Sequence, residues 1–378
     1  MSKIDNITLH PALLDIVDYR KSGLSLNHIV GCPLNCAYCV RHFFDNFDLK
    51  KPTILATDEE AVNTLVSHQF FIPHLTPLQL FNRATDPFLP DVRLHTHKVL
   101  QLLDERAFTN LMLIITRYKV TAEDMELLES LRHLRVTLLV TYSGLPDGEI
   151  EPLSHSITRK SIETIAKQKR RTKLILYWRP IVPGWNDDEE TIRHTLSVAE
   201  QADAIAYTGL FYRPEQENYF DKEGIKIPYE LTHRRKILPA ETEARILKLY
   251  NEFGGSTPLF RKTSCAVSFA HELPDYNGHY GIPELCNICP QHQVKRCTAA
   301  YKIPSTEEVT TLLNMYGYET DFEIDDHHVW TIGLGEQKRY HLQHTLGFQI
   351  WDRGLPHLKG QHGRAPIGYP ESFSDPTI

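Results

Sequence analysis

Three cysteines near the N-terminus stand at the spacing C-x-x-x-C-x-x-C, at Cys32, Cys36 and Cys39. They follow directly on the apolar residues 26–30, a run that is typical of a buried strand. Three thiolates on one tight loop can each bind a different iron of a four-iron cube, which leaves the fourth iron without a protein ligand. An open metal position indicates chemistry at the metal, as it does in catalytic zinc sites.

A zinc knuckle, or cysteines grouped by chance, is the alternative interpretation, although cytosolic cysteine groups mostly serve metals or redox chemistry. The run resembles the signature of the radical S-adenosylmethionine (radical SAM) superfamily. In that family S-adenosylmethionine chelates the open iron of a [4Fe-4S] cluster. One electron from the reduced cluster then cleaves a carbon–sulfur bond of S-adenosylmethionine. The product is a 5′-deoxyadenosyl radical, which abstracts hydrogen from the substrate. The resemblance also implies that Tyr38, just before the third cysteine, lies near the adenine.

Four further cysteines fall in one late segment, at Cys265, Cys286, Cys289 and Cys297. Together they can form a tetrathiolate site, which suits either a second iron–sulfur cluster or a structural zinc. A site with three ligands and one open iron is a further alternative. We expect a second [4Fe-4S] cluster here, with zinc as the rival metal, because tetrathiolate ligation alone does not separate the two.

Strand-like runs alternate with amphipathic helical patterns from residue 26 to about 212. The predicted strands lie at 26–30, 78–82, 111–116, 136–141, 174–178 and 204–210. The predicted helices lie at 58–68, 91–104, 121–134, 156–168 and 188–201. Six β-then-α units imply parallel strands, arranged as a partial barrel or a doubly wound sheet. The resemblance favours the partial (β/α)6 barrel of radical SAM cores, with the cluster loop after the first strand.

The pattern changes after residue 211. Residues 212–236 predict a loop or lid, 239–253 and 307–316 predict helices, and the tail from 318 has a strand- and turn-like pattern. We therefore expect an α/β protein with an N-terminal extension at 1–19 and a radical SAM core at 20–255. A smaller C-terminal α+β metal-binding module is expected at 256–378.

Strand-end loops carry the active sites of such barrels. After the second predicted strand, Thr85-Asp86-Pro87 begins a Thr-Asp-Pro-x-x-Pro element where most radical SAM proteins have a Gly-Gly-Glu-like motif. This element resembles the spore photoproduct lyase-like branch. The resemblance implies that Thr85 and Asp86 meet the ammonium of S-adenosylmethionine through charge-assisted hydrogen bonds. The alternative is a proline-rich turn with an Asx cap.

Three more positions follow from strand ends and family patterns. The resemblance implies that Ser143, or secondarily Thr141, meets the ribose, although threonine also simply favours strands. It implies that Arg159 pairs with the carboxylate of S-adenosylmethionine, whereas the alternative is a surface helix arginine. Arg179 could meet an anionic substrate group if strand alternation turns it inward. His327, His328, His341 and His344 are interpreted as packing or surface residues.

The composition is that of an ordinary globular protein, with 41% hydrophobic and 24% charged residues among 378. A net charge of −7 argues against a broad surface for nucleic acid or anionic membrane, although it leaves room for a local basic groove. The N-terminal residues contain no apolar core of the signal-peptide type, and no long apolar run is present. We therefore expect a cytoplasmic protein.

The leading hypothesis is a radical SAM enzyme with its catalytic cluster on Cys32, Cys36 and Cys39. Its expected partners are S-adenosylmethionine, a one-electron donor such as flavodoxin or ferredoxin, and a small-molecule, nucleotide or peptide substrate. The alternative is a non-catalytic iron–sulfur or zinc protein that acts in redox transfer, sensing or as an adaptor.

Overall fold

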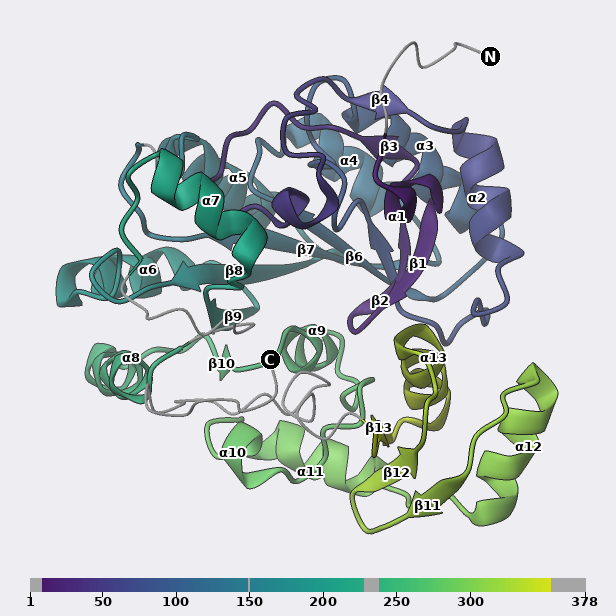
Figure 1. Cartoon of the computed structure of the whole chain (residues 1–378). Coiled ribbons are helices and arrows are strands. Elements are labelled where there is room, and N and C mark those ends of the chain that lie inside the picture. The colour runs from purple at the N-terminus through teal and green to yellow at the C-terminus, as the bar shows by residue number, and fades with distance from the viewer. Residues whose placement is uncertain (1–8, 149, 228–237, 355–378) are drawn as a thin grey trace.

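The computed structural model describes residues 9–148, 150–227 and 238–354, and an eight-stranded sheet forms its core (Figure 1). The order across the sheet is β1-β2-β5-β6-β7-β8-β9-β10. The strands are β1 Val17–Arg20, β2 Gly23–Leu26, β5 Leu78–Leu80, β6 Leu111–Thr116, β7 Arg135–Tyr142, β8 Lys173–Ile181, β9 Ala204–Gly209 and β10 Leu259–Phe260. β1 pairs antiparallel with β2, and the remaining neighbours pair in parallel.

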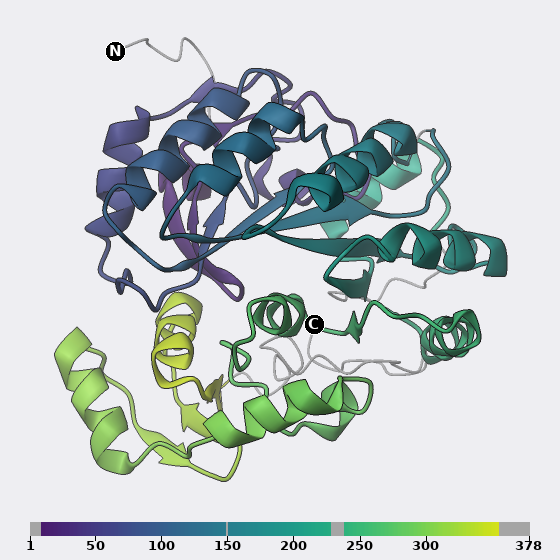
Figure 2. The ribbon, with the colours of Figure 1, turned by 180° about the vertical axis from the view of Figure 1, so that it is seen from behind.

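Helices cover one side of the sheet, as Figure 2 shows from behind. They are α2 Asp58–Val66, α3 Arg93–Asp104, α4 Ala122–Ser130, α5 His155–Gln168 and α6 Glu189–Ala199. Capping boxes begin α2 at Thr57 and α4 at Thr121. Asp188 caps α6, where its side chain accepts from the Thr191 backbone N–H. These β–α connections match the predicted architecture.

The first predicted strand is wrong in its extent, because the sheet strand ends at Leu26. Asn27 interrupts it: its backbone N–H donates to the Ile16 carbonyl at 2.7 Å, and its side chain donates to Ser25 Oγ at 2.9 Å. β3 Ile29–Val30 then pairs with β4 Thr53–Ile54 in a separate two-stranded sheet. The cysteine run therefore leaves from this small sheet.

The C-terminal part lies against the opposite side of the sheet (Figure 1). Its elements are α8 Ala240–Phe253, α9 Thr263–Ala270, α10 Pro283–Cys286, α11 Gln291–Ala300, α12 Thr306–Tyr316, β11 Phe322–Ile324, β12 His328–Thr331, α13 Glu336–Leu346 and β13 Gln349–Asp352. α9 packs on β8 and β9. Part of the core sheet is therefore covered by a helix that lies beyond residue 255 in the sequence. The prediction missed α13 and the short strands β1 and β10.

Three short helical elements complete the described chain: α1 Pro11–Leu14, η1 Val40–Phe44 and α7 Pro214–Lys222. α7 falls within the stretch predicted as a loop or lid, and residues 228–237 of that stretch lie outside the described residues. No helix in the described ranges is long and apolar enough to span a bilayer.

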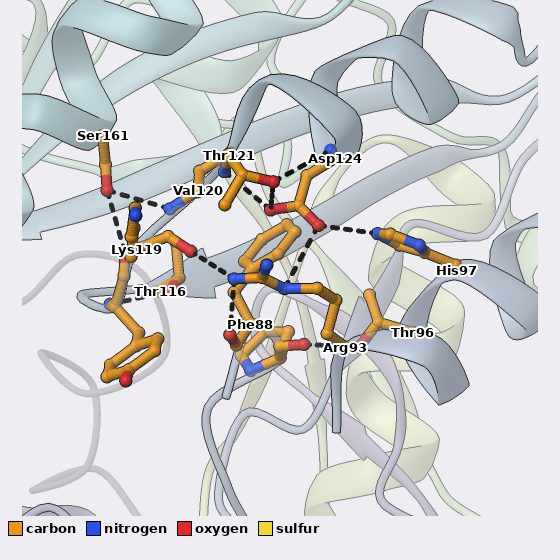
Figure 3. Close-up of polar contacts among 12 residues, drawn as sticks. Phe88, Arg93, Thr96, His97, Thr116, Lys119, Val120, Thr121, Asp124 and Ser161 are labelled. Atoms are coloured by element: carbon orange, nitrogen blue, oxygen red, sulfur yellow. Dashed lines mark hydrogen bonds and ion pairs between the residues drawn. The ribbon is translucent and has the colours of Figure 1, made fainter. Parts of the chain in front are cut away.

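A buried carboxylate, Asp124, joins α3 to α4 (Figure 3). It accepts hydrogen bonds from the backbone N–H and the Oγ1 of Thr121, at 2.7 and 3.0 Å. His97 Nε2 lies 2.9 Å from its Oδ1, and the Nε of Arg93 lies 3.3 Å away. Asp124 thus accepts hydrogen bonds from the N-cap residue of α4 and also forms an ion pair with Arg93 at the start of α3.

That arginine in turn fixes the loop after β5. Arg93 Nη2 donates to the carbonyls of Phe88 and Lys119, at 3.2 and 2.8 Å (Figure 3). Thr96 Oγ1 donates to the carbonyl of Pro87 at 2.8 Å. The loop that carries Thr85 and Asp86 is therefore anchored to α3 over its following residues.

Replacing Asp124 by alanine should lower the free energy of unfolding by about 3 kcal/mol or more. The change removes the carboxylate that completes the capping box of α4 and leaves the half-buried Arg93 without its acid. The measurement is urea denaturation of the metal-free, reduced protein. Glu189→Ala is the control, because its ion pair with Arg193 is exposed and should be worth less than about 1 kcal/mol. Equal losses for the two variants would contradict the assigned role of Asp124.

Candidate metal and cofactor site

The three cysteines of the N-terminal run lie on the loop between β3 and η1, with Cys32 and Cys36 buried and Cys39 half-buried. Gly31 begins this loop with φ of +98°, and a Cβ there would lie 2.3 Å from the Lys51 carbonyl oxygen. The position therefore requires glycine. The Cys32 backbone N–H donates to Leu49 at 2.9 Å, which closes the loop on itself.

The buried guanidinium of Arg41 organises the inside of the loop. Its Nη2 donates to the Leu34 carbonyl at 2.7 Å. Its Nη1 lies 3.1 to 3.3 Å from the carbonyl oxygens of Asn46, Phe47 and Leu49. One side chain thus ties the cysteine segment to the returning half of the loop, using the planar fork that only arginine offers.

An apolar cluster covers the loop. Cys36, Ala37 and Tyr38 pack with buried residues from strand ends and from α7, among them Val182 and Phe220. The His42 ring stacks on Phe47 at a centroid distance of 3.8 Å, and Tyr219 of α7 lies against both rings. The thiols therefore lie in surroundings with little water.

Burial raises the pKa of the two buried thiols, Cys32 and Cys36. It raises the pKa of Cys32 to about 11, although Arg41 opposes the shift. It raises the pKa of Cys36 to about 12, where Arg117 is the opposing charge. A set of thiolates at neutral pH therefore needs a bound cation, so the donor set fits a thiophilic metal centre such as an iron–sulfur cluster.

The structure places Asp86 and Thr85 at the end of β5, but their side chains differ in what they contact. Asp86 is buried, and its carboxylate accepts from Thr116 Oγ1 at 2.7 Å and from the Phe88 and Arg117 backbone N–H groups at 3.0 and 2.9 Å. Within the described residues Thr85 Oγ1 is buried and has no hydrogen-bond partner. Asp86 thus joins two strand-end loops, while Thr85 offers a free hydroxyl.

Arg117 is a candidate that the sequence reasoning missed. It follows directly on β6, and its guanidinium contacts the hydroxyl of Tyr38 and lies 3.2 Å from Glu151. Tyr38 donates in turn to the buried Glu151. The signal that could have found Arg117 is its place, since it is the first residue after a strand whose C-terminal end faces the site.

The remaining predicted contacts are more dispersed. Ser143 is buried, and its Oγ accepts from the Leu145 N–H at 3.1 Å, while Thr141 lies buried within β7. Arg159 is exposed on α5. The Cζ of Arg179 lies 4.5 Å from the centre of the Tyr177 ring. The described contacts therefore gather Tyr38, Arg117 and Glu151 beside the cysteines, and do not bring Arg159 into that group.

The four late cysteines line a single cavity. Cys265 comes from α9, Cys286 ends α10, Cys289 follows in the connecting loop and Cys297 comes from α11. Burial raises the pKa of Cys289 to about 12 and that of Cys297 to about 11. We call this cavity the C-terminal chamber; its donor set also fits a thiophilic metal centre.

No protein-family model and no curated protein sequence matches the chain. Among solved structures it resembles spore photoproduct lyase complexed with dinucleoside spore photoproduct, with a TM-score of 0.50 and 13% identity. The match covers 65% of this chain and 78% of that one. A spore photoproduct lyase variant with bound AdoMet and the same dinucleoside gives the same values. The likeness confirms the predicted α/β fold.

Arg41→Met should destabilise the metal-free protein by about 1–3 kcal/mol, because the Leu34 carbonyl loses its donor and a buried unpaired acceptor costs about that much. The carbonyls of Asn46, Phe47 and Leu49 also lose Arg41 but each keeps another donor. Urea denaturation under reducing conditions measures the loss. Arg106→Met is the matched control, since Arg106 donates to Leu102 and Asn63 at the exposed surface. A loss for Arg41→Met no larger than for Arg106→Met would show that the guanidinium does not hold the loop.

Proposed function

We propose that the protein is a radical SAM enzyme whose catalytic [4Fe-4S] cluster is held by Cys32, Cys36 and Cys39. One observation carries the proposal: the C-x-x-x-C-x-x-C thiols lie together on a buried loop of a chain with the fold of spore photoproduct lyase. The bound cluster with S-adenosylmethionine would supply a 5′-deoxyadenosyl radical by reductive cleavage. The residues around the cluster would bind and orient the reactants and exclude water.

The surrounding residues have separate tasks in this proposal. The unpartnered Thr85 hydroxyl is the group available to S-adenosylmethionine, and Asp86 holds the loop that presents it. Arg117 lies close enough to Cys36 to oppose the effect of burial on its pKa, and Glu151 balances that arginine. Tyr38 and the apolar cover from α7 exclude water from the radical chemistry. Ser143 and Arg159 remain the proposed ribose and carboxylate contacts.

Wild-type protein, reconstituted without oxygen and reduced with dithionite, should convert S-adenosylmethionine to 5′-deoxyadenosine and methionine. Cys36→Ala should abolish the product. Thr85→Val should weaken S-adenosylmethionine binding about 10-fold, the worth of one hydrogen bond of roughly 1.4 kcal/mol. Chromatography of the products and equilibrium dialysis measure the two effects. Thr64→Val, an exposed hydroxyl on α2, is the control.

The rival class, a non-catalytic redox, sensor or adaptor protein, makes the opposite prediction for the same assay. Its cysteines would bind metal, yet no 5′-deoxyadenosine would form from wild-type protein with any reductant. If wild-type protein with a full complement of iron forms no 5′-deoxyadenosine, the proposal that it is a radical SAM enzyme is wrong. The proposal that its cysteines bind metal would be unaffected.

We also propose a second metal centre in the C-terminal chamber, held by Cys265, Cys286, Cys289 and Cys297. Reconstituted wild-type protein should contain about eight irons, falling to about four when Cys32, Cys36 and Cys39 are all changed to alanine. Iron, sulfide and zinc analysis measures this. About four irons with one zinc, where only zinc survives the change, would make the chamber a structural zinc site. Zinc without iron in both proteins would remove the radical SAM proposal.

The substrate is proposed only as a class. The structural relative is complexed with a dinucleoside, which makes a nucleotide one candidate beside a small molecule and a peptide. The net charge of −7 leaves no excess of positive charge for a long nucleic acid. We further propose a flavodoxin or ferredoxin as electron donor.

A further inference from the structure

A buried histidine faces the C-terminal chamber with one nitrogen unused. His279 is 1% exposed and lines the cavity together with the four cysteines. Its Nδ1 lies 2.7 Å from Asp275 Oδ2, which also accepts the backbone N–H of His279 at 3.0 Å. Its Nε2 is buried and, within the described residues, has no hydrogen-bond partner.

The Asp275 contact decides which nitrogen carries the proton. A carboxylate oxygen that accepts this hydrogen bond needs the proton on Nδ1, which in a neutral imidazole leaves a lone pair on Nε2. A carboxylate that holds Nδ1–H in this way is the usual outer partner of a metal-bound histidine.

The spacing of the donor atoms fits a shared metal centre. One ligand atom from each of Cys265, Asp275 and His279 lies within 4.8 Å of the other two. A sulfur and a nitrogen on one tetrahedral ion, bonded at about 2.3 and 2.05 Å, are about 3.6 Å apart. The His279 ring and the Cys265 thiol are thus near enough to serve one ion, at a cavity that the other three thiols also line.

A second buried histidine, His341, serves as a comparison. His341 also lacks a partner for Nε2, and its Nδ1 lies 3.0 Å from Tyr318 Oη. Its ring, however, packs among aromatic rings, including Tyr316 at 4.3 Å and Phe70 at 5.1 Å. The His341 imidazole thus lies among aromatic rings, whereas His279 lines a cavity together with four thiols.

We propose that His279 is a metal ligand of the C-terminal chamber through Nε2, and that Asp275 orients it. The proposal rests on the second metal centre proposed above and changes its chemistry. The chamber offers five donors, four thiols and one imidazole, and in a centre with four protein-bound positions His279 takes the place of one of the four cysteines proposed above. A mixed sulfur and nitrogen set distinguishes it from the all-thiolate loop at Cys32, Cys36 and Cys39.

The test uses the full chain with Cys32, Cys36 and Cys39 changed to alanine, so that only the chamber can bind metal. The protein is labelled with ¹⁵N-histidine and loaded either with iron and sulfide or with Zn²⁺. Pulsed EPR of the reduced iron centre should show the hyperfine coupling of a directly bound nitrogen. X-ray absorption of the zinc form should show a nitrogen shell at about 2.0 Å beside sulfur at about 2.3 Å.

Two substitutions sharpen the result. His279→Gln should abolish the nitrogen signal, whereas His341→Gln, the matched buried histidine, should leave it unchanged. Asp275→Asn should keep the signal and weaken metal binding 10- to 100-fold in chelator competition, as loss of an outer partner does. If His279→Gln does not fold, the signal of the unsubstituted chamber still decides.

Three outcomes would overturn the proposal. The first is a metal centre with sulfur ligands and no bound nitrogen. The second is a nitrogen signal and metal content that persist in His279→Gln. The third is a chamber that takes up neither iron nor zinc, which would also remove the second centre. None of them touches S-adenosylmethionine cleavage, so a failed His279 proposal is distinguishable from a failed radical SAM proposal.

Discussion

The N-terminal site depends on the hydrogen bonds that the buried Arg41 guanidinium donates to backbone carbonyls. Burying a charge costs several kcal/mol unless hydrogen bonds replace its water, and here the backbone carbonyls of one loop take that role. No carboxylate pairs with Arg41 in the part of the chain that the structure describes. Its positive charge therefore remains available to Cys32, whose thiolate it favours. The same group thus shapes the loop and favours the thiolate form of Cys32.

The sheet supplies the second constraint, because its parallel strands end at one edge. Asp86 follows β5 and Arg117 follows β6, and the hydrogen bond from the Arg117 backbone to the Asp86 carboxylate joins the two ends. Arg93 holds the same loop from behind, through the carbonyls of Phe88 and Lys119 (Figure 3). The loops that carry Asp86 and Arg117 are thus held by rigid elements on two sides.

The features that could be predicted from the sequence are those whose signal lies within a short stretch of the chain. The cysteine spacings and the apolar runs of the sheet are local, and the fold and the two cysteine groups followed from them. α13 was missed because its buried side carries polar residues, including His341, Gln343 and His344, so apolar periodicity is absent. Arg117 was missed because its partners, Tyr38 and Glu151, lie far away in the chain, and only the folded sheet brings them together.

The chamber and the docking of α13 share one segment, residues 275–279. Asp275 and His279 face the chamber, while Asn277 between them accepts from Gln343 at 2.7 Å and contacts His344 Nε2 at 2.8 Å. His344 Nδ1 lies in turn 2.9 Å from the hydroxyl of Tyr19 on β1.

Gly278 makes this close approach possible. With φ of +71°, it admits no Cβ, since one would lie 2.6 Å from the Gly347 carbonyl oxygen at the end of α13. A metal that fixed His279 would therefore also fix Asn277, and through it the contact between α13 and the edge strand of the core. Because metal binding and packing order the same few residues, each lowers the entropic cost of the other.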